Sequence, residues 1–532
     1  MLDLFAPYWD RVLDFALWAM QGRRLFVTLA VVAIFFAWGG LKVKGGGQPR
    51  HYILLLAATP LLVIAGMLVG WAVGTLLSAL GVSDVPNRQT VLFSLFPMVA
   101  FAMGYATATG DGGPAHQRGA LINGSQDAVR ATKKWRKKYP DGLTLAGIGL
   151  GTSDETKHFK MIGTTGTGKS TAIRELVGGA IRRGDRAVIA DPDAGYLGSF
   201  YNPERGDVIL NPFDPRGRRW DLFKELRSAY DYDQLARSLI GAGEGGDRSW
   251  RQYAQVFFSS TLRQLHQAGV TDIGQLYRML TVAPVEELKI LLDGTPARPF
   301  LDEGNERMFG SIRSVTAAAV APLDYIQSQD AKPFSIRDWV QSGQGVLFLP
   351  YQADQIAALR SVISTWMRIA IFQTMSQRER DHRLWFVVDE LDALGPIDGL
   401  KDALARLRKF GGRCVLGFQS IAQVRGTYGD AESQTIVENC GTTLILRCSA
   451  SEGGGTAQFA SKLIGDRQIV RIEVSHSRSD SVLVDPRSST TEGQKHVTEA
   501  AVMPSEIEQL PDLEGLLKFA SSPQWLRIAL RP

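Results

Sequence analysis

A glycine-rich stretch set between a strand pattern and a helix pattern limits most strongly what this chain can fold into. Residues 163–170 read GTTGTGKS, which fits the pattern G-x-x-x-x-G-K-[ST]. The preceding KHFKMI is typical of an entering strand, and the following STAIRELVGGAIRR has apolar residues at helical spacing. The glycines allow backbone N–H groups to converge on phosphate oxygens. The sequence therefore predicts an α/β fold with a nucleoside triphosphate site.

The residues of this phosphate loop have distinct expected roles. We expect Lys169 to reach the β- and γ-phosphates as a point charge and the Ser170 hydroxyl to hold Mg²⁺. The residues expected to bind ATP are Gly163, Thr164, Thr165, Gly166, Thr167, Gly168, Lys169, Ser170 and Thr171.

The other half of the site is expected where an acidic residue ends a buried strand. The stretch RLWFVVDELDAL has a continuous apolar run that ends at Asp389. We expect Asp389 to hold Mg²⁺ through water and Glu390 to activate the attacking water. Asp389 follows Lys169 by 220 residues, more chain than a compact nucleotide kinase needs. The serine-glycine-glycine signature of ABC transporter ATPases is not recognised between them.

The intervening chain changes from strand patterns to helix patterns and back. DRAVIADPDAGYL and GDVILNPFD have the apolar runs of further strands, the following segments have helical spacing, and GQGVLFLPY returns to a strand pattern. We therefore expect a nucleotide-binding domain formed by residues 111–219 and 332–532, with an inserted all-helical domain at 220–331. Residues 1–110, which precede both, are expected to form an N-terminal transmembrane region, as argued below.

Two further residues are candidates for the site. The strand pattern RCVLGFQS ends at Gln419, and an amide at the tip of a neighbouring strand suits a sensor that positions the attacking water. The preceding ALARLRKFGG contains Arg408. If the protein forms a ring, Arg408 could reach the ATP of the neighbouring subunit.

Three apolar runs at the start of the chain predict an α-helical transmembrane region. They cover residues 25–41, 52–80 and 91–110, and a helix needs about 20 apolar residues to span a bilayer. Basic residues place the linker 42–51 in the cytoplasm and the linker 81–90 outside. The second and third runs then form a hairpin; whether the first run spans, and hence the side of the N-terminus, stays open.

The nucleotide site and the cysteine usage predict a cytoplasmic location for the rest of the chain. The net charge is +5, and ATKKWRKKYP places five basic residues around Trp135 just beyond the apolar runs. We expect this basic cluster to face lipid, with nucleic-acid contact and a solvated surface as alternatives. The cysteines occur in no C-x-x-C pair, which favours reduced thiols. They are Cys414, Cys440 and Cys448.

Taken together, several stretches resemble the type IV secretion coupling proteins, the TraD-like conjugative DNA pumps. They lie in the family's order between Gly163 and Gly515: GTTGTGKS, ILNPFDPRGRRWDLFKE, PFSIRDWV, LWFVVDEL, RKFGGRCVLGFQSIAQVRGTYG and SEIEQLPDLEG. The phosphate loop is common to many ATPases, whereas RKFGG followed by GFQSIAQ is far more specific to this family.

The resemblance implies a RecA-like motor that forms a hexamer at the bacterial inner membrane, with its ATPase domain in the cytoplasm. It would hydrolyse ATP with Mg²⁺ and carry relaxase-bound single-stranded DNA to the secretion channel. By match to the family's motifs, Lys169 and Ser170 bind phosphate and Mg²⁺, Asp389 and Glu390 form the second acidic motif, and Gln419 is the sensor. Arg408 matches the family's trans-acting arginine.

The N-terminus departs from the family's usual pattern, because two membrane helices are expected and up to three apolar runs are present. Two other functions stay open. One is a chromosome-segregation translocase of the same superfamily, although the DNA-reading module expected of it is not recognised. The other is a docking platform that recruits relaxosome and channel proteins through the helical insertion and the membrane segment.

Overall fold

The computed structural model of the chain describes Ile34, Trp38 and residues 115–531, except for 244–245, 379–381, 452 and 480–486. The predicted transmembrane runs therefore lie outside the described residues, apart from Ile34 and Trp38. Among the helices that are described, none has both the length and the apolar character needed to cross a bilayer. The chain divides into two compact units, 1–117 with 468–497 and 118–467 with 498–532. Most of the features discussed below lie in the second unit.

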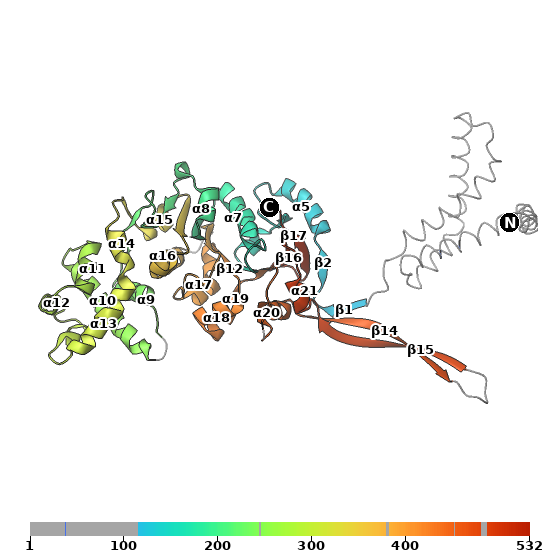
Figure 1. Cartoon of the computed structure of the whole chain (residues 1–532). Coiled ribbons are helices and arrows are strands. Elements are labelled where there is room, and N and C mark those ends of the chain that lie inside the picture. The colour runs from blue at the N-terminus through green and yellow to red at the C-terminus, as the bar shows by residue number, and fades with distance from the viewer. Residues whose placement is uncertain are drawn as a thin grey trace, which may run out of the picture. The chain divides into compact units, whose positions relative to one another are not determined.

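A ten-stranded sheet forms the centre of the second unit (Figure 1). Seven neighbouring strands pair in parallel, and β16 then joins β13 in antiparallel fashion. In spatial order the strands are β2 (Ile122–Gly124), β17 (Trp525–Ala529), β16 (Glu514–Lys518), β13 (Thr442–Ile445), β5 (Phe159–Ile162), β12 (Gly412–Phe418), β11 (Leu384–Val388), β6 (Arg186–Pro192), β10 (Val346–Tyr351) and β7 (Val208–Ile209).

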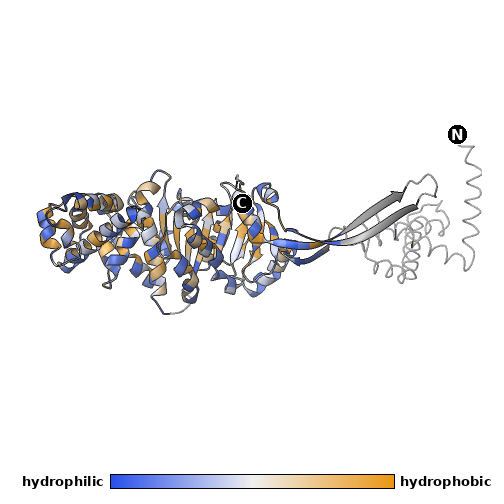
Figure 2. Ribbon diagram, turned by 90° about the horizontal axis from the view of Figure 1, so that it is seen from below, coloured by the Kyte–Doolittle hydropathy of each residue, from blue (hydrophilic) through white to orange (hydrophobic). Residues whose placement is uncertain are grey.

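The central strands are buried and rich in apolar residues because both faces of the sheet are covered (Figure 2). Alternate residues of β11 show this: Phe386 belongs to the buried core on one face, and Trp385 belongs to the core on the other. The covering helices are α5 (Gln126–Lys138), α7 (Lys169–Arg182), α8 (Gly195–Phe200), α15 (Ile336–Ser342), α16 (Ile356–Met375), α17 (Leu400–Leu407), α18 (Ile421–Tyr428), α19 (Asp430–Asn439), α20 (Gly455–Ile464) and α21 (Pro504–Glu508).

A group of helices follows β7 and precedes β10. They are α9 (Asp231–Ile240), α10 (Asp247–Gln267), α11 (Ile273–Thr281), α12 (Val285–Leu291), α13 (Glu306–Val320) and α14 (Pro322–Gln327). The strand β8 (Arg219–Trp220) precedes these helices and pairs in parallel with β9 (Pro333–Phe334), which follows them. Trp220 packs edge-on against Trp366 of α16, with ring centroids 5.9 Å apart. The helices share one continuous core with α16, so separate domain boundaries here remain a prediction.

Smaller sheets complete the described part of the chain. The strands β3 (Thr144–Leu145) and β4 (Ile148–Gly149) form a two-stranded antiparallel sheet. The strands β1 (Ala115–Gly119), β14 (Asp466–Ser479) and β15 (Arg487–Ala500) form a three-stranded sheet. The cysteines at 414, 440 and 448 are all buried and unpaired.

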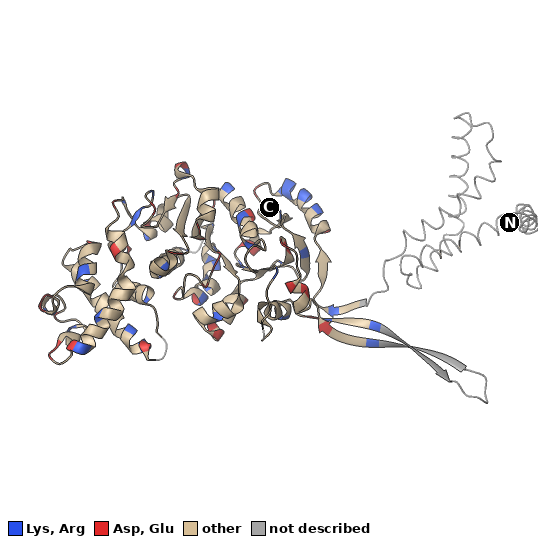
Figure 3. Ribbon diagram, viewed as in Figure 1, with Lys and Arg blue, Asp and Glu red and all other residues tan. Residues whose placement is uncertain are grey.

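The basic cluster lies on α5 (Figure 3). The indole of Trp135 is half-buried and packs on the protein itself, since a Cβ on Gly142 or Gly149 would collide with its ring. The lysines and Arg130 lie on the exposed side of the helix. Trp135 is therefore a packing residue of this helix, and the cations alone are free to meet a charged partner.

Candidate active site

The carboxyl ends of four parallel strands bring the predicted site residues to one edge of the sheet. The phosphate loop follows β5, Gln419 follows β12, Asp389 follows β11, and the segment 192–196 follows β6. Because parallel strands all end at the same edge, residues far apart in sequence meet there. They line a pocket of about 350 Å³. The pocket is lined by both predicted halves of the site, from Thr164–Arg174 and from Asp389, Glu390 and Gln419.

The phosphate loop has the backbone conformation that glycines permit. Gly166 and Gly168 have φ angles of 78° and 110°, in the left-handed region. The loop is held from outside: Thr164 N donates to Arg447 O at 2.9 Å, and Leu513 N donates to Thr167 O at 2.9 Å. Lys169 is the first residue of α7, and N–H groups in the first turn of a helix have no intrahelical acceptor. The loop and helix start therefore form an anion site.

Asp389 connects the two halves of the site. Its Oδ2 accepts hydrogen bonds from Ser170 Oγ at 2.6 Å and from Tyr196 Oη at 2.7 Å. Its Oδ1 lies 3.4 Å from Lys169 Nζ. Both Asp389 and Lys169 are buried, with 3% and 6% of their surfaces exposed. The structure thus brings together Lys169, Ser170 and Asp389 as the sequence predicts.

The second oxygen of Asp389 is poised for a further ligand. Although Lys169 forms an ion pair with it, Oδ1 is buried and accepts no hydrogen bond. A buried polar atom without a hydrogen bond carries a desolvation cost unless something else satisfies it. Oxygen ligands suit Mg²⁺, which usually keeps several waters. Ser170 Oγ and Asp389 Oδ1 are therefore the atoms that could hold a divalent cation, directly or through water.

A hydrogen-bonded chain crosses the pocket from one half to the other. Gln419 Nε2 donates to Glu390 Oε1 at 3.0 Å, and Thr165 Oγ1 donates to Gln419 Oε1 at 2.9 Å. Burial raises the pKa of Glu390, an effect that the positive charge of Lys169 partly offsets. A higher pKa makes this carboxylate a better proton acceptor near neutral pH. The sensor and the general base predicted from sequence are thus in direct contact.

Arg408 lies away from the pocket of its own chain. It begins a single 3₁₀ turn, Arg408–Phe410, which directly precedes β12. The seven residues of β12 extend over about 20 Å, so Arg408 is at the opposite edge of the sheet from Gln419. Its charge helps to lower the pKa of buried His158, which precedes β5 at that same edge. Arg408 is exposed and could only act on a nucleotide held by another subunit.

Tyr196 and Arg174 are among the pocket residues that sequence reasoning missed. Tyr196, 2% exposed, belongs to α8 and hydrogen-bonds Asp389, and Arg174 lies with its guanidinium 5.5 Å from the centroid of the Tyr196 ring. Asp191 orients α8 by accepting hydrogen bonds from Tyr196 N at 2.9 Å and Leu197 N at 2.6 Å. Burial raises the pKa of Asp191 to about 6. No motif marks Tyr196; only its place five residues after a strand-ending aspartate could have suggested it.

A phosphate loop after β5 and an acidic end of β11, on parallel strands separated by β12, define a RecA-like nucleotide-binding protein. The sequence profile of the type IV secretion-system coupling protein DNA-binding domain, TrwB_AAD_bind, matches residues 142–531. The chain therefore belongs to the family of type IV secretion coupling proteins.

Relatives and solved structures agree with this assignment. The chain is 32% identical to the coupling protein TraD of Escherichia coli over 402 residues, which is 74% of this chain and 55% of TraD. It is 24% identical to VirD4 of Agrobacterium fabrum over 357 residues, 63% of this chain and 50% of VirD4. The chain thus spans about half the length of these curated relatives.

Structures of the bacterial conjugative coupling protein TrwB have a similar fold. The unbound form has a TM-score of 0.69 at 30% identity, with 78% of this chain and 93% of TrwB covered. A TrwB structure in complex with ADP and Mg²⁺ has a TM-score of 0.68 at 30% identity, with 78% and 94% covered.

Proposed function

We propose that this chain is a DNA-dependent ATP hydrolase that couples relaxase-bound single-stranded DNA to a type IV secretion channel. The observation that supports this most directly is the joining of Lys169, Ser170 and Asp389 with Glu390 and Gln419 in one pocket of a coupling-protein fold. TrwB of the same fold is described in complex with ADP and Mg²⁺. The geometry supports ATP and Mg²⁺ as the ligands here.

Lys169 and the loop would hold the triphosphate. The loop N–H groups and the start of α7 supply partial positive charge, and Lys169 Nζ leaves Asp389 to meet the β- and γ-phosphates. Ser170 Oγ and Asp389 would hold Mg²⁺, which neutralises charge on the phosphate oxygens when bound. These residues bind and orient the substrate before any bond breaks.

Glu390 and Gln419 would handle the attacking water. Glu390 accepts a proton from that water, and its raised pKa suits this role. Gln419 bridges Glu390 and Thr165 of the phosphate loop. It can therefore orient the water with respect to both the base and the γ-phosphate. Gln419 reaches both Glu390 and Thr165 because β12 lies between β5 and β11.

The assembly and partners complete the proposal. A homo-hexamer at the bacterial inner membrane, anchored by the apolar runs within residues 1–110, would present the exposed Arg408 of one subunit to the nucleotide of the next. The DNA would be held mainly through its phosphates, because a pump must pass any sequence. TraD is named a coupling protein and TrwB a bacterial conjugative coupling protein, which supports secretion-channel proteins and a relaxase as partners.

The proposal is tested by measuring ATP hydrolysis of the full chain in lipid nanodiscs with and without single-stranded DNA. We expect hydrolysis to require Mg²⁺ and to rise on addition of DNA. Transfer of a mobilisable plasmid should fail in a deletion strain. A chain that recruits the relaxase but shows no DNA-stimulated hydrolysis would instead act as a docking platform. Normal transfer with defective chromosome partition would favour a segregation translocase.

Tyr196 provides a specific prediction for the metal site. Tyr196→Phe keeps the buried ring but removes the hydroxyl that donates to Asp389 Oδ2. Groups that orient a metal-binding side chain change metal affinity by about tenfold or more. We expect the Mg²⁺ concentration for half-maximal hydrolysis to rise about tenfold, with kcat at saturating Mg²⁺ much less affected.

Tyr201→Phe is the matched control. Tyr201 directly follows α8, and its ring packs against Phe348 outside the nucleotide pocket. It should leave the Mg²⁺ requirement unchanged. An unchanged Mg²⁺ titration in Tyr196→Phe would show that Tyr196 only fills space.

A further inference from the structure

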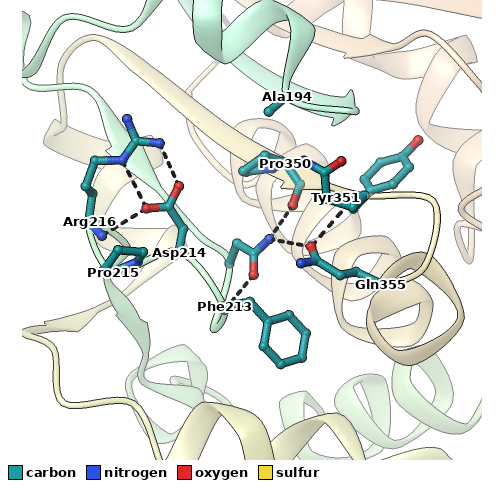
Figure 4. A pocket seen from close by; sticks show the side chains of 10 residues that line it. Ala194, Phe213, Asp214, Pro215, Arg216, Pro350, Tyr351 and Gln355 are labelled. Atoms are coloured by element: carbon teal, nitrogen blue, oxygen red, sulfur yellow. Dashed lines mark hydrogen bonds and ion pairs between the residues drawn. The ribbon is translucent and has the colours of Figure 1, made fainter.

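A second pocket lies beside the nucleotide pocket at the same edge of the sheet. It has a volume of about 300 Å³ and is built on the segments that follow β6, β7 and β10 (Figure 4). Its lining includes Phe213 and Arg216 on the loop after β7, and Tyr351 at the end of β10. Neither the phosphate loop nor the acidic residues of the nucleotide site reach it.

The floor of this pocket is a fixed network of hydrogen bonds. Asn211 Nδ2 donates to Pro350 O at 2.9 Å and to Gln355 Oε1 at 3.2 Å, and Asn211 Oδ1 accepts from Phe213 N at 2.7 Å. Asn211 is 5% exposed. The network holds the start of the 213–216 loop in place, so the side chains at the rim are presented on a rigid support.

The rim carries an exposed aromatic pair. Phe213 is 43% exposed and Tyr325 of α14 is 41% exposed. Their ring centroids lie 5.0 Å apart, with the planes tilted by 54°. Two large rings together at the surface offer apolar faces to a flat ligand. Nucleic-acid bases are such ligands, and they stack on aromatic side chains with little regard to sequence.

A cation lies on the same loop as Phe213. Arg216 directs Nε and Nη2 to Asp214, at 3.0 and 2.7 Å. Its side chain is 54% exposed, and the guanidinium lies 5.4 Å from the Tyr201 ring centroid. A guanidinium has five N–H donors, so Arg216 can bind an external anion as well as Asp214. Figure 4 shows Phe213 and Arg216 on different sides of the pocket.

The wall between the two pockets is a strained turn. Asp193 lines the nucleotide pocket and Ala194 lines the second pocket. Both residues have φ of 54°, a left-handed conformation that is unfavourable without glycine. Asp193 N also donates to Tyr351 O at 2.8 Å. The two pockets therefore share this two-residue turn, and a movement of the turn would alter the lining of both.

We propose that the second pocket binds one nucleotide unit of single-stranded DNA, with the base against Phe213 and Tyr325 and a phosphate on Arg216. The site rests on the proposed function, because it assumes that DNA is the partner. Single-stranded DNA fits this chemistry better than a duplex, whose bases are stacked and cannot reach a rim of aromatic rings. Through the Asp193–Ala194 turn, occupancy of this pocket stimulates hydrolysis in the adjoining one.

The experiment uses the full chain in nanodiscs and a fluorescent oligo(dT), with binding followed by anisotropy. Phe213→Ala should weaken binding about tenfold. Arg216→Ala should lower the slope of log affinity against log salt by about 0.7, as expected for one lost phosphate contact. Both should reduce the DNA stimulation of hydrolysis and leave hydrolysis without DNA unchanged. Tyr230→Ala and Arg307→Ala, at exposed positions outside this pocket, are the controls.

A direct contact is tested by photocrosslinking with an oligonucleotide that carries 5-iodouracil. Crosslinks to Phe213 or Tyr325 support the site. If the unsubstituted chain binds DNA but both variants bind it equally well and no crosslink maps to these rings, the site is overturned while the proposed function stands. If the unsubstituted chain neither binds DNA nor responds to it, the proposed function and this site both fail.

Discussion

Lys169→Ala is expected to lower ATP hydrolysis by about a thousandfold and to abolish DNA transfer. Lys169 is 6% exposed and its Nζ lies 3.4 Å from Asp389 Oδ1, so the ammonium group enters the pocket at the junction of its two halves. Removing one well-placed group that stabilises developing phosphate charge costs about 10²–10³ in rate, and a cation on the transferred phosphoryl group can be worth more. The rate is measured with a coupled ADP assay, and transfer by mating.

The substitution also changes the charge balance of the site in the protein without nucleotide. In the unsubstituted chain Asp389 is 3% exposed, and Lys169→Ala removes the cation that pairs with its carboxylate. Lys462→Ala, on the exposed side of α20, is the matched control and should behave as the unsubstituted chain. If Lys169→Ala hydrolyses ATP normally, or transfers DNA at the normal frequency, the motor mechanism is wrong.

The positions of Asp389 and Gln419 could be predicted from the sequence because each residue follows a buried strand. Asp389 and Gln419 follow fully buried runs of five and seven residues, and short buried runs are typical of central parallel strands. Since parallel strands end together, their polar tips converge. The contact between Gln419 and Glu390 depends on more, namely that β12 inserts between β5 and β11. Strand order is a tertiary property, and no local pattern encodes it.

Tyr196 shows where the prediction stops. Its hydroxyl reaches Asp389 because the chain turns sharply at Asp193 and Ala194, both with φ of 54°. Non-glycine residues seldom adopt that conformation, so propensity argues against the turn that is found. Hydrogen bonds from Tyr196 N and Leu197 N to buried Asp191 help to hold the segment in place. The second pocket includes Ala194 of this turn and could not be predicted from the sequence for the same reason.

Arg408→Ala is the second substitution with a large expected effect. An arginine supplied to a neighbouring nucleotide typically accelerates hydrolysis by about 10³–10⁵. We expect a loss of about a thousandfold in hydrolysis, with binding of a fluorescent ATP analogue nearly unchanged. Lys409→Ala, the adjacent exposed cation, is the control and should retain activity. Equal activity of Arg408→Ala and the unsubstituted chain would remove Arg408 from the mechanism.

Mixing two inactive chains separates action within a subunit from action between subunits. Lys169→Ala chains keep Arg408, and Arg408→Ala chains keep an intact phosphate loop. In a ring with head-to-tail interfaces, an Arg408→Ala subunit supplies an intact phosphate loop, and a neighbouring Lys169→Ala subunit supplies Arg408, so their interface holds one complete site. Random mixing of equal amounts produces this arrangement at about a quarter of the interfaces. We therefore expect about a quarter of normal hydrolysis to return in the mixture.

The fold makes this outcome a strict test. Arg408 precedes β12 and Gln419 follows it, so the two lie about 20 Å apart across the sheet. An arginine side chain cannot cover that span within one chain. Recovery in the mixture thus requires an interface that joins the amino-terminal edge of one sheet to the carboxyl edge of the next. If the mixture stays inactive although both chains co-assemble, Arg408 acts on no nucleotide, and the loss in Arg408→Ala reflects the interface alone.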